Sequence, residues 1–69
     1  MKDLQTINPK EHTQNIKSGL QEITDHLRKD VEKVNDPRAK ALFETSAEVI
    51  NGLINAFSHY EQESEKAWK

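Results

Sequence analysis

The chain has 69 residues, of which 33% are apolar and 32% are charged, and its net charge is −2. A chain this short forms one domain and buries only about 60% of the surface that its unfolded form exposes. It has no cysteine, which excludes disulfides and thiolate metal sites, and its slight acidic excess does not favour nonspecific binding to nucleic acid. Among the usual ways to stabilise so small a core, association with another chain remains.

The first predicted helix begins in the segment "INPKE". Asn8 suits the N-cap, Pro9 suits the first helical position, and Glu11 favours the positive end of the helix dipole. Apolar residues then recur at spacings of three and four, and they span an arc of about 80°, which is a narrow seam. These residues are Ile16, Leu20, Ile23, Leu27, Val31 and Val34. The pattern predicts a helix over about residues 9–34.

The second predicted helix begins in "VNDPRA", where Asp36 is the N-cap candidate and Pro37 the first helical residue. It continues over about residues 37–67. The connection between the helices is very short, and a short connection makes two helices antiparallel neighbours. The sequence therefore predicts an all-α fold, an antiparallel two-helix hairpin in a single domain over residues 1–69.

The apolar residues of the second helix spread over roughly 180° of its circumference, which is more than one narrow seam can cover. They are Ala39, Leu42, Phe43, Ala47, Val49, Ile50, Leu53, Ile54, Ala56, Phe57 and Tyr60. A soluble monomer avoids leaving so wide a face exposed, so we expect a second partner for this helix. A second copy would give a homodimeric four-helix bundle, and an amphipathic helix of another protein would satisfy the same requirement.

Six large residues are predicted to carry self-association, whereas Ile16, Leu20, Ile23 and Leu27 are predicted to close the hairpin. The self-association residues are Leu42, Phe43, Ile50, Leu53, Ile54 and Phe57. A margin of small residues, Ala41, Thr45, Gly52 and Ala56, has two interpretations. It indicates either a close helix crossing, with Gly19 at the height of Gly52, or a tolerated weakness of the helix.

No pattern typical of catalysis is present: the serines lack a neighbouring base, and there is no glycine-rich phosphate loop or H-E-x-x-H zinc motif. His12, His59 and Glu63 could be arranged around a metal, but surface histidines are the simpler interpretation. His26, with Glu22 and Asp30 one turn away, is also expected at the surface. We therefore predict no enzyme activity, no cofactor and no metal site.

The predicted function is that of a noncatalytic protein–protein interaction or regulatory module acting through helix–helix association. The alternative is an RNA- or DNA-binding helical-hairpin dimer, using basic residues that gather near the turn: Arg28, Lys29, Lys33, Arg38 and Lys40. Acidic residues are interleaved with them, so a mixed charged surface is the competing interpretation. Tyr60 and Trp68 in the polar tail are candidates for binding a partner, or Trp68 packs on the N-terminal segment.

The stretch "DPRAKALFETSAEVINGLINAFSHYE", with the Trp68 that follows, resembles short bacterial helical proteins over residues 36–68. The resemblance implies a bacterial, soluble, helical chain and no particular activity. No apolar run approaches the ~20 residues of a membrane-spanning helix, and no secretory segment is evident. We expect a cytoplasmic location without membrane contact.

Overall fold

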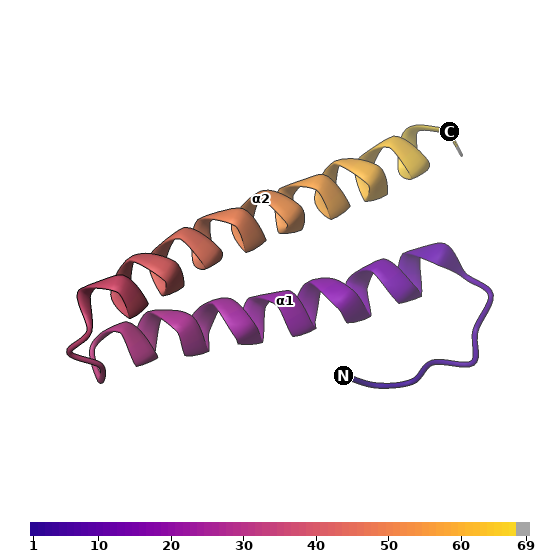
Figure 1. The fold of residues 1–69 in the computed structure, drawn as a ribbon. Coiled ribbons are helices and arrows are strands. Elements are labelled where there is room, and N and C mark those ends of the chain that lie inside the picture. Colours follow the sequence, from indigo (N-terminus) through magenta and orange to yellow (C-terminus); the bar gives the residue numbers. More distant parts are fainter. Residues whose placement is uncertain (68–69) are drawn as a thin grey trace.

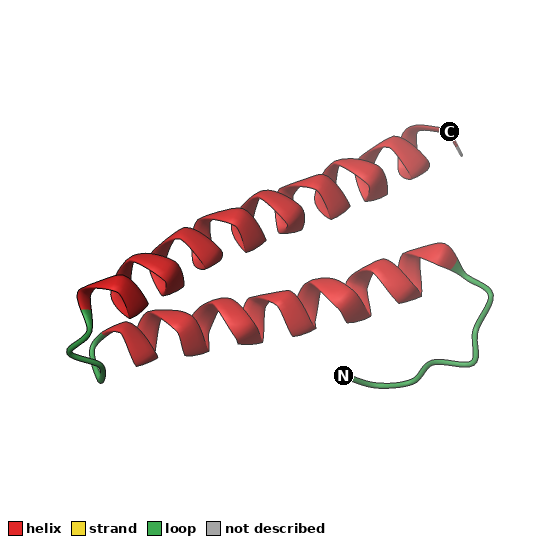
Figure 2. Cartoon of the chain, viewed as in Figure 1, coloured by secondary structure: helices red, strands yellow, loops and turns green. Residues whose placement is uncertain are grey.

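The chain forms two long helices that pack side by side (Figure 1). In this computed structural model, the backbone is described for residues 1–67 and the side chains for residues 1–63. Helix α1 covers Pro9–Val31 and helix α2 covers Pro37–Ala67. Figure 2 shows loop only before α1 and between the helices, and residues 1–67 contain no strand. The predicted all-α hairpin is confirmed, and Trp68 lies outside the described residues.

Both helices begin where the sequence predicts, and by the same device. The side-chain oxygen of Asn8 accepts a hydrogen bond from the backbone N–H of Lys10 at 3.0 Å. Asp36 Oδ1 accepts one from the backbone N–H of Arg38, also at 3.0 Å. In each case proline follows the cap and contributes no N–H that would need a partner.

Helix α1 ends at Val31, earlier than the predicted end near Val34. The backbone N–H of Lys33 donates to the carbonyl of Asp30 at 2.9 Å, so the last turn tightens into three-residue spacing. The chain must then leave the helix and become extended before Pro37, because the residue before a proline avoids the helical region. Residues 32–34, which the apolar periodicity assigned to α1, therefore belong to the connection between the helices.

The hairpin is a single layer of helices. Its principal extents are 50 × 23 × 12 Å, and the smallest of these equals the diameter of one helix with its side chains, about 10–12 Å. The radius of gyration is 15.1 Å, whereas a compact domain of this length has about 11 Å. Each helix therefore has one helical neighbour, and two broad faces of the layer face solvent.

The contact between the helices buries little. Among the described side chains, only Thr24 of α1, at 1% exposure, and Ala47 of α2, at 4%, are buried. The Thr24 hydroxyl donates to the carbonyl of Leu20 at 3.0 Å, so this buried polar group is satisfied within its own helix. Two small side chains at the contact let the backbones approach closely, but they supply a very small core.

The predicted seam of α1 is rotated in the structure. Ile16, Leu20 and Leu27 are half-buried, as expected of residues that close the hairpin. Ile23 is 47% exposed, so its assignment to the closing seam is wrong. The reason is that α1 turns Thr24 toward α2, which moves the adjacent Ile23 to the edge of the contact.

Of the two interpretations of the small residues, a close crossing of α1 and α2 at the two glycines is not present within the chain. A Cβ added at Gly52 would meet no atom within 4 Å, whereas one at Gly19 would lie 2.5 Å from Met1 Cε. Gly19 is thus covered by the segment before α1, and Gly52 faces open space. Although the two glycines are equally far from the turn, neither one lies where α1 and α2 pack together in the single chain.

Replacing Asp36 with Ala should lower the free energy of unfolding by about 1 kcal/mol, because the first turn of α2 loses its capping acceptor. Asp36→Asn is the matched control, since asparagine caps as well without the charge. Urea unfolding followed by circular dichroism at one protein concentration measures both variants. Equal stability of the Ala and Asn variants would contradict the capping role.

Replacing Gly52 with Ala should raise the free energy of unfolding by about 0.5–1 kcal/mol, because the site is helical and has room for a methyl group. Thermal unfolding followed by circular dichroism measures this change. A loss of stability would show that Gly52 packs against something in the folded protein.

Candidate functional site

The most unusual feature of the hairpin is a strip of large apolar side chains on α2 that α1 does not cover. At 100° per residue, Leu42, Val49, Leu53 and Tyr60 fall within an arc of about 40°. Their exposures lie between 46% and 62%. Single exposed apolar residues are ordinary on a protein surface, but an aligned row of four is not.

This outer strip is distinct from the residues with which α2 contacts α1. Ala47 is buried, and Phe43, Ile50 and Ile54 are half-buried, so the contact face of α2 is centred among them. The centre of the outer strip lies about 110° away around the helix. The wide apolar arc of α2 therefore divides into an inner part, which holds the hairpin together, and an outer part without a partner in this chain.

Ile23 extends the outer strip onto α1. Around α1, in the direction of increasing residue number, Ile23 lies about 90° before the centre of the face that contacts α2. Around α2, in the same direction, the outer strip lies about 110° before the centre of the face that contacts α1. Because both helices are right-handed and run antiparallel, displacement in the same rotational sense brings both sets to the same side of the layer. We call Ile23, Leu42, Val49, Leu53 and Tyr60 the apolar face.

The opposite side of the layer is polar. The same geometry places Gln21 and Arg28 of α1 there, together with Glu44 and Asn51 of α2, and all four are exposed. The hairpin is therefore a thin layer with one apolar and one polar face. Such a layer is amphipathic in the way that a single surface helix is, but over two helices.

The six predicted self-association residues are divided by this geometry. Leu42 and Leu53 lie on the apolar face, as does the predicted partner-binding residue Tyr60. Phe43, Ile50, Ile54 and Phe57 are half-buried on the side nearer α1. Val49 falls in the predicted wide apolar arc but not among the predicted self-association residues, and Ile23 was predicted at the hairpin contact. The spacing of Leu42, Val49, Leu53 and Tyr60 could have found the strip, because it forms a row separate from Phe43, Ala47, Ile50 and Ile54.

The basic residues near the turn do not converge on one surface. Arg28, Lys29, Lys33 and Arg38 are exposed, and Lys40 is half-buried. Lys33 Nζ lies 3.7 Å from Asp30 Oδ1, and Arg38 Nε lies 3.8 Å from Asp36 Oδ1. Arg28 belongs to the polar side of the layer, whereas Arg38 lies toward the other side, beside Leu42.

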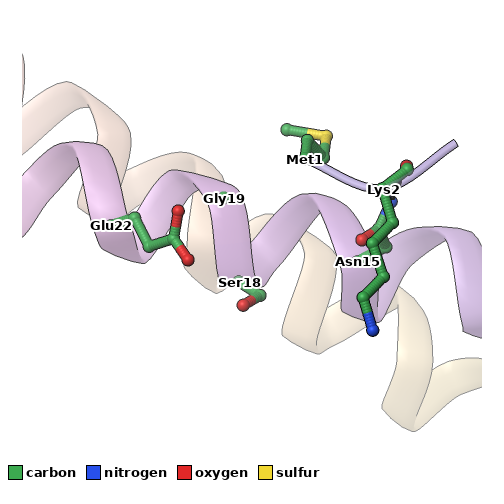
Figure 3. A pocket seen from close by; sticks show the side chains of 6 residues that line it. All are labelled: Met1, Lys2, Asn15, Ser18, Gly19 and Glu22. Carbon is green, nitrogen blue, oxygen red and sulfur yellow. Dashed lines mark hydrogen bonds between the residues drawn. The ribbon is translucent and has the colours of Figure 1, made fainter.

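Among the described residues, open hollows of different size lie beside the hairpin. The larger, of about 430 Å³, lies where Met1 and Lys2 cross α1 beside Asn15, Ser18, Gly19 and Glu22 (Figure 3). Asn15 Nδ2 donates to the carbonyl of Lys2 there at 2.8 Å. The second hollow, of about 220 Å³, places Arg28 beside the carboxylates of Glu44 and Glu48, a charge pattern that does not favour phosphate.

The histidines make no metal centre in the part of the chain whose side chains are described. No three His, Asp or Glu side chains in that part lie close enough together to hold an ion. His12 Nε2 lies 2.7 Å from the carbonyl oxygen of Thr6. A carbonyl only accepts, so this ring nitrogen carries a proton and fastens the segment before α1.

Glu61 links the two helices near the end of the hairpin that is remote from the turn. Its carboxylate accepts hydrogen bonds from the Thr13 hydroxyl at 2.8 Å and from Lys17 Nζ at 3.2 Å. The Thr13 hydroxyl also lies 2.9 Å from the carbonyl oxygen of Lys10. Because a hydroxyl has one proton to donate and the charged carboxylate is the stronger acceptor, the hydrogen bond goes to Glu61. The hydrogen bond from Thr13 and the charges of Lys17 and Lys10 hold the pKa of Glu61 below its ordinary value, against the opposing effect of burial.

No family model, curated protein or solved structure matches this chain. The resemblance of residues 36–68 to short bacterial helical proteins stays a prediction. Within the described residues, neither helix contains a stretch long and apolar enough to cross a bilayer.

Replacing Glu61 with Gln should make the stability of the hairpin less dependent on acid pH. The pKa of Glu61 is lower in the folded chain than its ordinary value of 4.5, so the ionised carboxylate stabilises the fold above about pH 4.5. This stabilisation is lost as the pH falls through the lower pKa of the folded state. Urea unfolding at neutral pH and at successively more acid pH measures the loss. Glu48→Gln, an exposed carboxylate on the same helix, is the control and should keep the wild-type profile. An unchanged profile for Glu61→Gln would contradict the role of this link.

Proposed function

We propose that the protein is a noncatalytic interaction module that works through helix–helix association, and that its apolar face pairs with that of a second copy to form a four-helix bundle. The observation that carries the proposal is the exposure of Ile23, Leu42, Val49, Leu53 and Tyr60 on one side of a layer one helix thick. A folded domain normally consists of at least two layers around a core, and here the second layer is missing.

The energetics of the single chain support association. Only Thr24 and Ala47 are buried among the described side chains, and the larger apolar residues at the helix contact are half-buried, so one hairpin obtains only part of the hydrophobic stabilisation that its apolar residues could give. Fully burying one Leu, Val or Ile side chain contributes about 1.5–3 kcal/mol. Covering five half-exposed apolar residues on each of two chains would therefore add several kcal/mol to what the hairpin contact supplies.

A second copy is the partner that fits this face most simply. An apolar layer placed against an identical layer covers both faces with one symmetric interface, as in homodimeric bundles. The whole layer measures 50 by 23 Å, so one side of it has room for the ~800 Å² that each partner buries in a standard stable interface. The polar sides of both hairpins would then form the outer surface.

Replacing Leu53 with Asp should convert the associated protein into a helical monomer at micromolar concentration. The aspartate would be buried without a partner in the interface, and a penalty of roughly 3 kcal/mol corresponds to about a hundredfold weaker association. Sedimentation equilibrium measures the mass, and circular dichroism measures helicity. Leu53 is suitable because it is 49% exposed in the single chain, whereas Ile54 also packs toward α1 and its replacement would damage the hairpin itself.

Asn51→Asp is the matched control, because it adds the same side chain two positions away on the polar side of α2. It should associate as the wild type does. If Leu53→Asp remains associated, or if the wild-type chain is a monomer throughout the accessible concentration range, pairing through the apolar face is wrong.

A further inference from the structure

The pattern of charge beside the outer strip of α2 indicates which element covers it. We infer that α2 packs antiparallel against α2 of a second copy, in a register that places Leu42 opposite Tyr60 and Val49 opposite Leu53 of that copy. This inference rests on the proposed function, and it specifies which helices meet, in which direction and at which height.

The spacing of the strip supports a helix-to-helix seam. Residues 42, 46, 49, 53, 56 and 60 alternate at intervals of four and three, which is the heptad spacing of a helix that contacts one neighbour along its length. In the inferred register, each of these six positions lies opposite one of the six in the other copy. Leu42 lies opposite Tyr60 in the two outer layers of the seam, Ser46 opposite Ala56 in the two intermediate layers, and Val49 opposite Leu53 in the two central layers. A shift by one heptad would leave apolar layers unpaired.

The charges at the two ends of the strip select the antiparallel direction. Arg38 lies beside Leu42 at one end, and Glu63 lies beside Tyr60 at the other. Both are exposed, and the Arg38 side chain is 95% accessible. In the antiparallel register each Arg38 lies next to Glu63 of the other copy, so the two ends of the seam carry opposite charges. A parallel pairing would bring the two Glu63 carboxylates together across the seam.

The position of Ile23 agrees with the same register. Thr13 of α1 contacts Glu61 of α2, and counting along both helices from that contact places Ile23 level with Asn51. The midpoint of the inferred seam is also at the height of residue 51. Ile23 of each copy would therefore lie near the two-fold axis, where it is covered although α2 of its own chain leaves it 47% exposed.

Charge reversal tests the direction. Arg38→Glu should weaken association roughly tenfold at low salt, because two attractive pairs become repulsive, and Arg38→Glu with Glu63→Arg should restore it. Glutamate in the first turn of α2 favours the helix dipole, so the loss would not come from a weaker helix. Lys40→Glu makes the same change of net charge in the same turn of α2, but toward the polar side of the layer, and should leave association unchanged. If Arg38→Glu has no more effect than Lys40→Glu, or if the double variant does not recover, the antiparallel seam is wrong.

Cysteine cross-linking tests the register, because the chain contains no cysteine of its own. Leu42→Cys and Tyr60→Cys are mixed, allowed to exchange and oxidised, and the product is weighed by mass spectrometry. The inferred register predicts a disulfide between the two different variants and none within either one alone, since two Cα atoms at position 42 would be about 27 Å apart. A disulfide within the Leu42→Cys variant would show a parallel pairing instead.

The two failures are distinguishable by the mass of the wild-type chain. A wild-type dimer without the mixed disulfide overturns the inferred seam but leaves association through the apolar face standing. A wild-type monomer overturns both.

Discussion

The thickness of the hairpin is the constraint on which the rest of the structure depends. Two antiparallel helices form a layer 12 Å thick, so every side chain that points out of the layer meets solvent in the single chain. Only small residues, Thr24 and Ala47, are buried where the helices meet. The larger apolar side chains are half-buried around that contact or exposed beyond it, and five of the exposed ones gather on one side. A layer built this way lacks the covering that a stable core needs.

Polar interactions accompany the apolar contact at the two ends of the hairpin. Near the turn, Asp36 caps α2. At the remote end, the Glu61 carboxylate receives hydrogen bonds from Thr13 and Lys17 across the helix pair. Between these points, the inner strip of α2 contacts α1 and the outer strip is exposed. The unusual apolar width of α2 thus corresponds to two separate surfaces, and the proposed association assigns a partner to the second one.

Much of the fold could be predicted from local sequence features, because capping is a short-range interaction. Asn8–Pro9 and Asp36–Pro37 determine where the helices begin, and both starts are confirmed. The end of α1 could not be placed, since apolar periodicity continues into Val34 while the turn before Pro37 takes those residues out of the helix. The rotation of α1 was also missed: a seam of large apolar residues predicts Ile23 at the contact, but close approach of the helices selects Thr24. The spacing of the apolar residues of α2 separates two rows, but only the structure shows which of the two rows α1 covers.

The measurement that tests the account most directly is the thermal midpoint of the wild-type chain over a hundredfold range of concentration, followed by circular dichroism. If folding is completed by covering the apolar face with a second copy, the midpoint must rise as concentration rises, because association stabilises the folded state by mass action. The account predicts this rise, with a low-temperature mass of twice the chain's 8.0 kDa at the upper concentrations. A midpoint independent of concentration, with the mass of one chain, would show that a single layer is stable alone and would contradict the central claim.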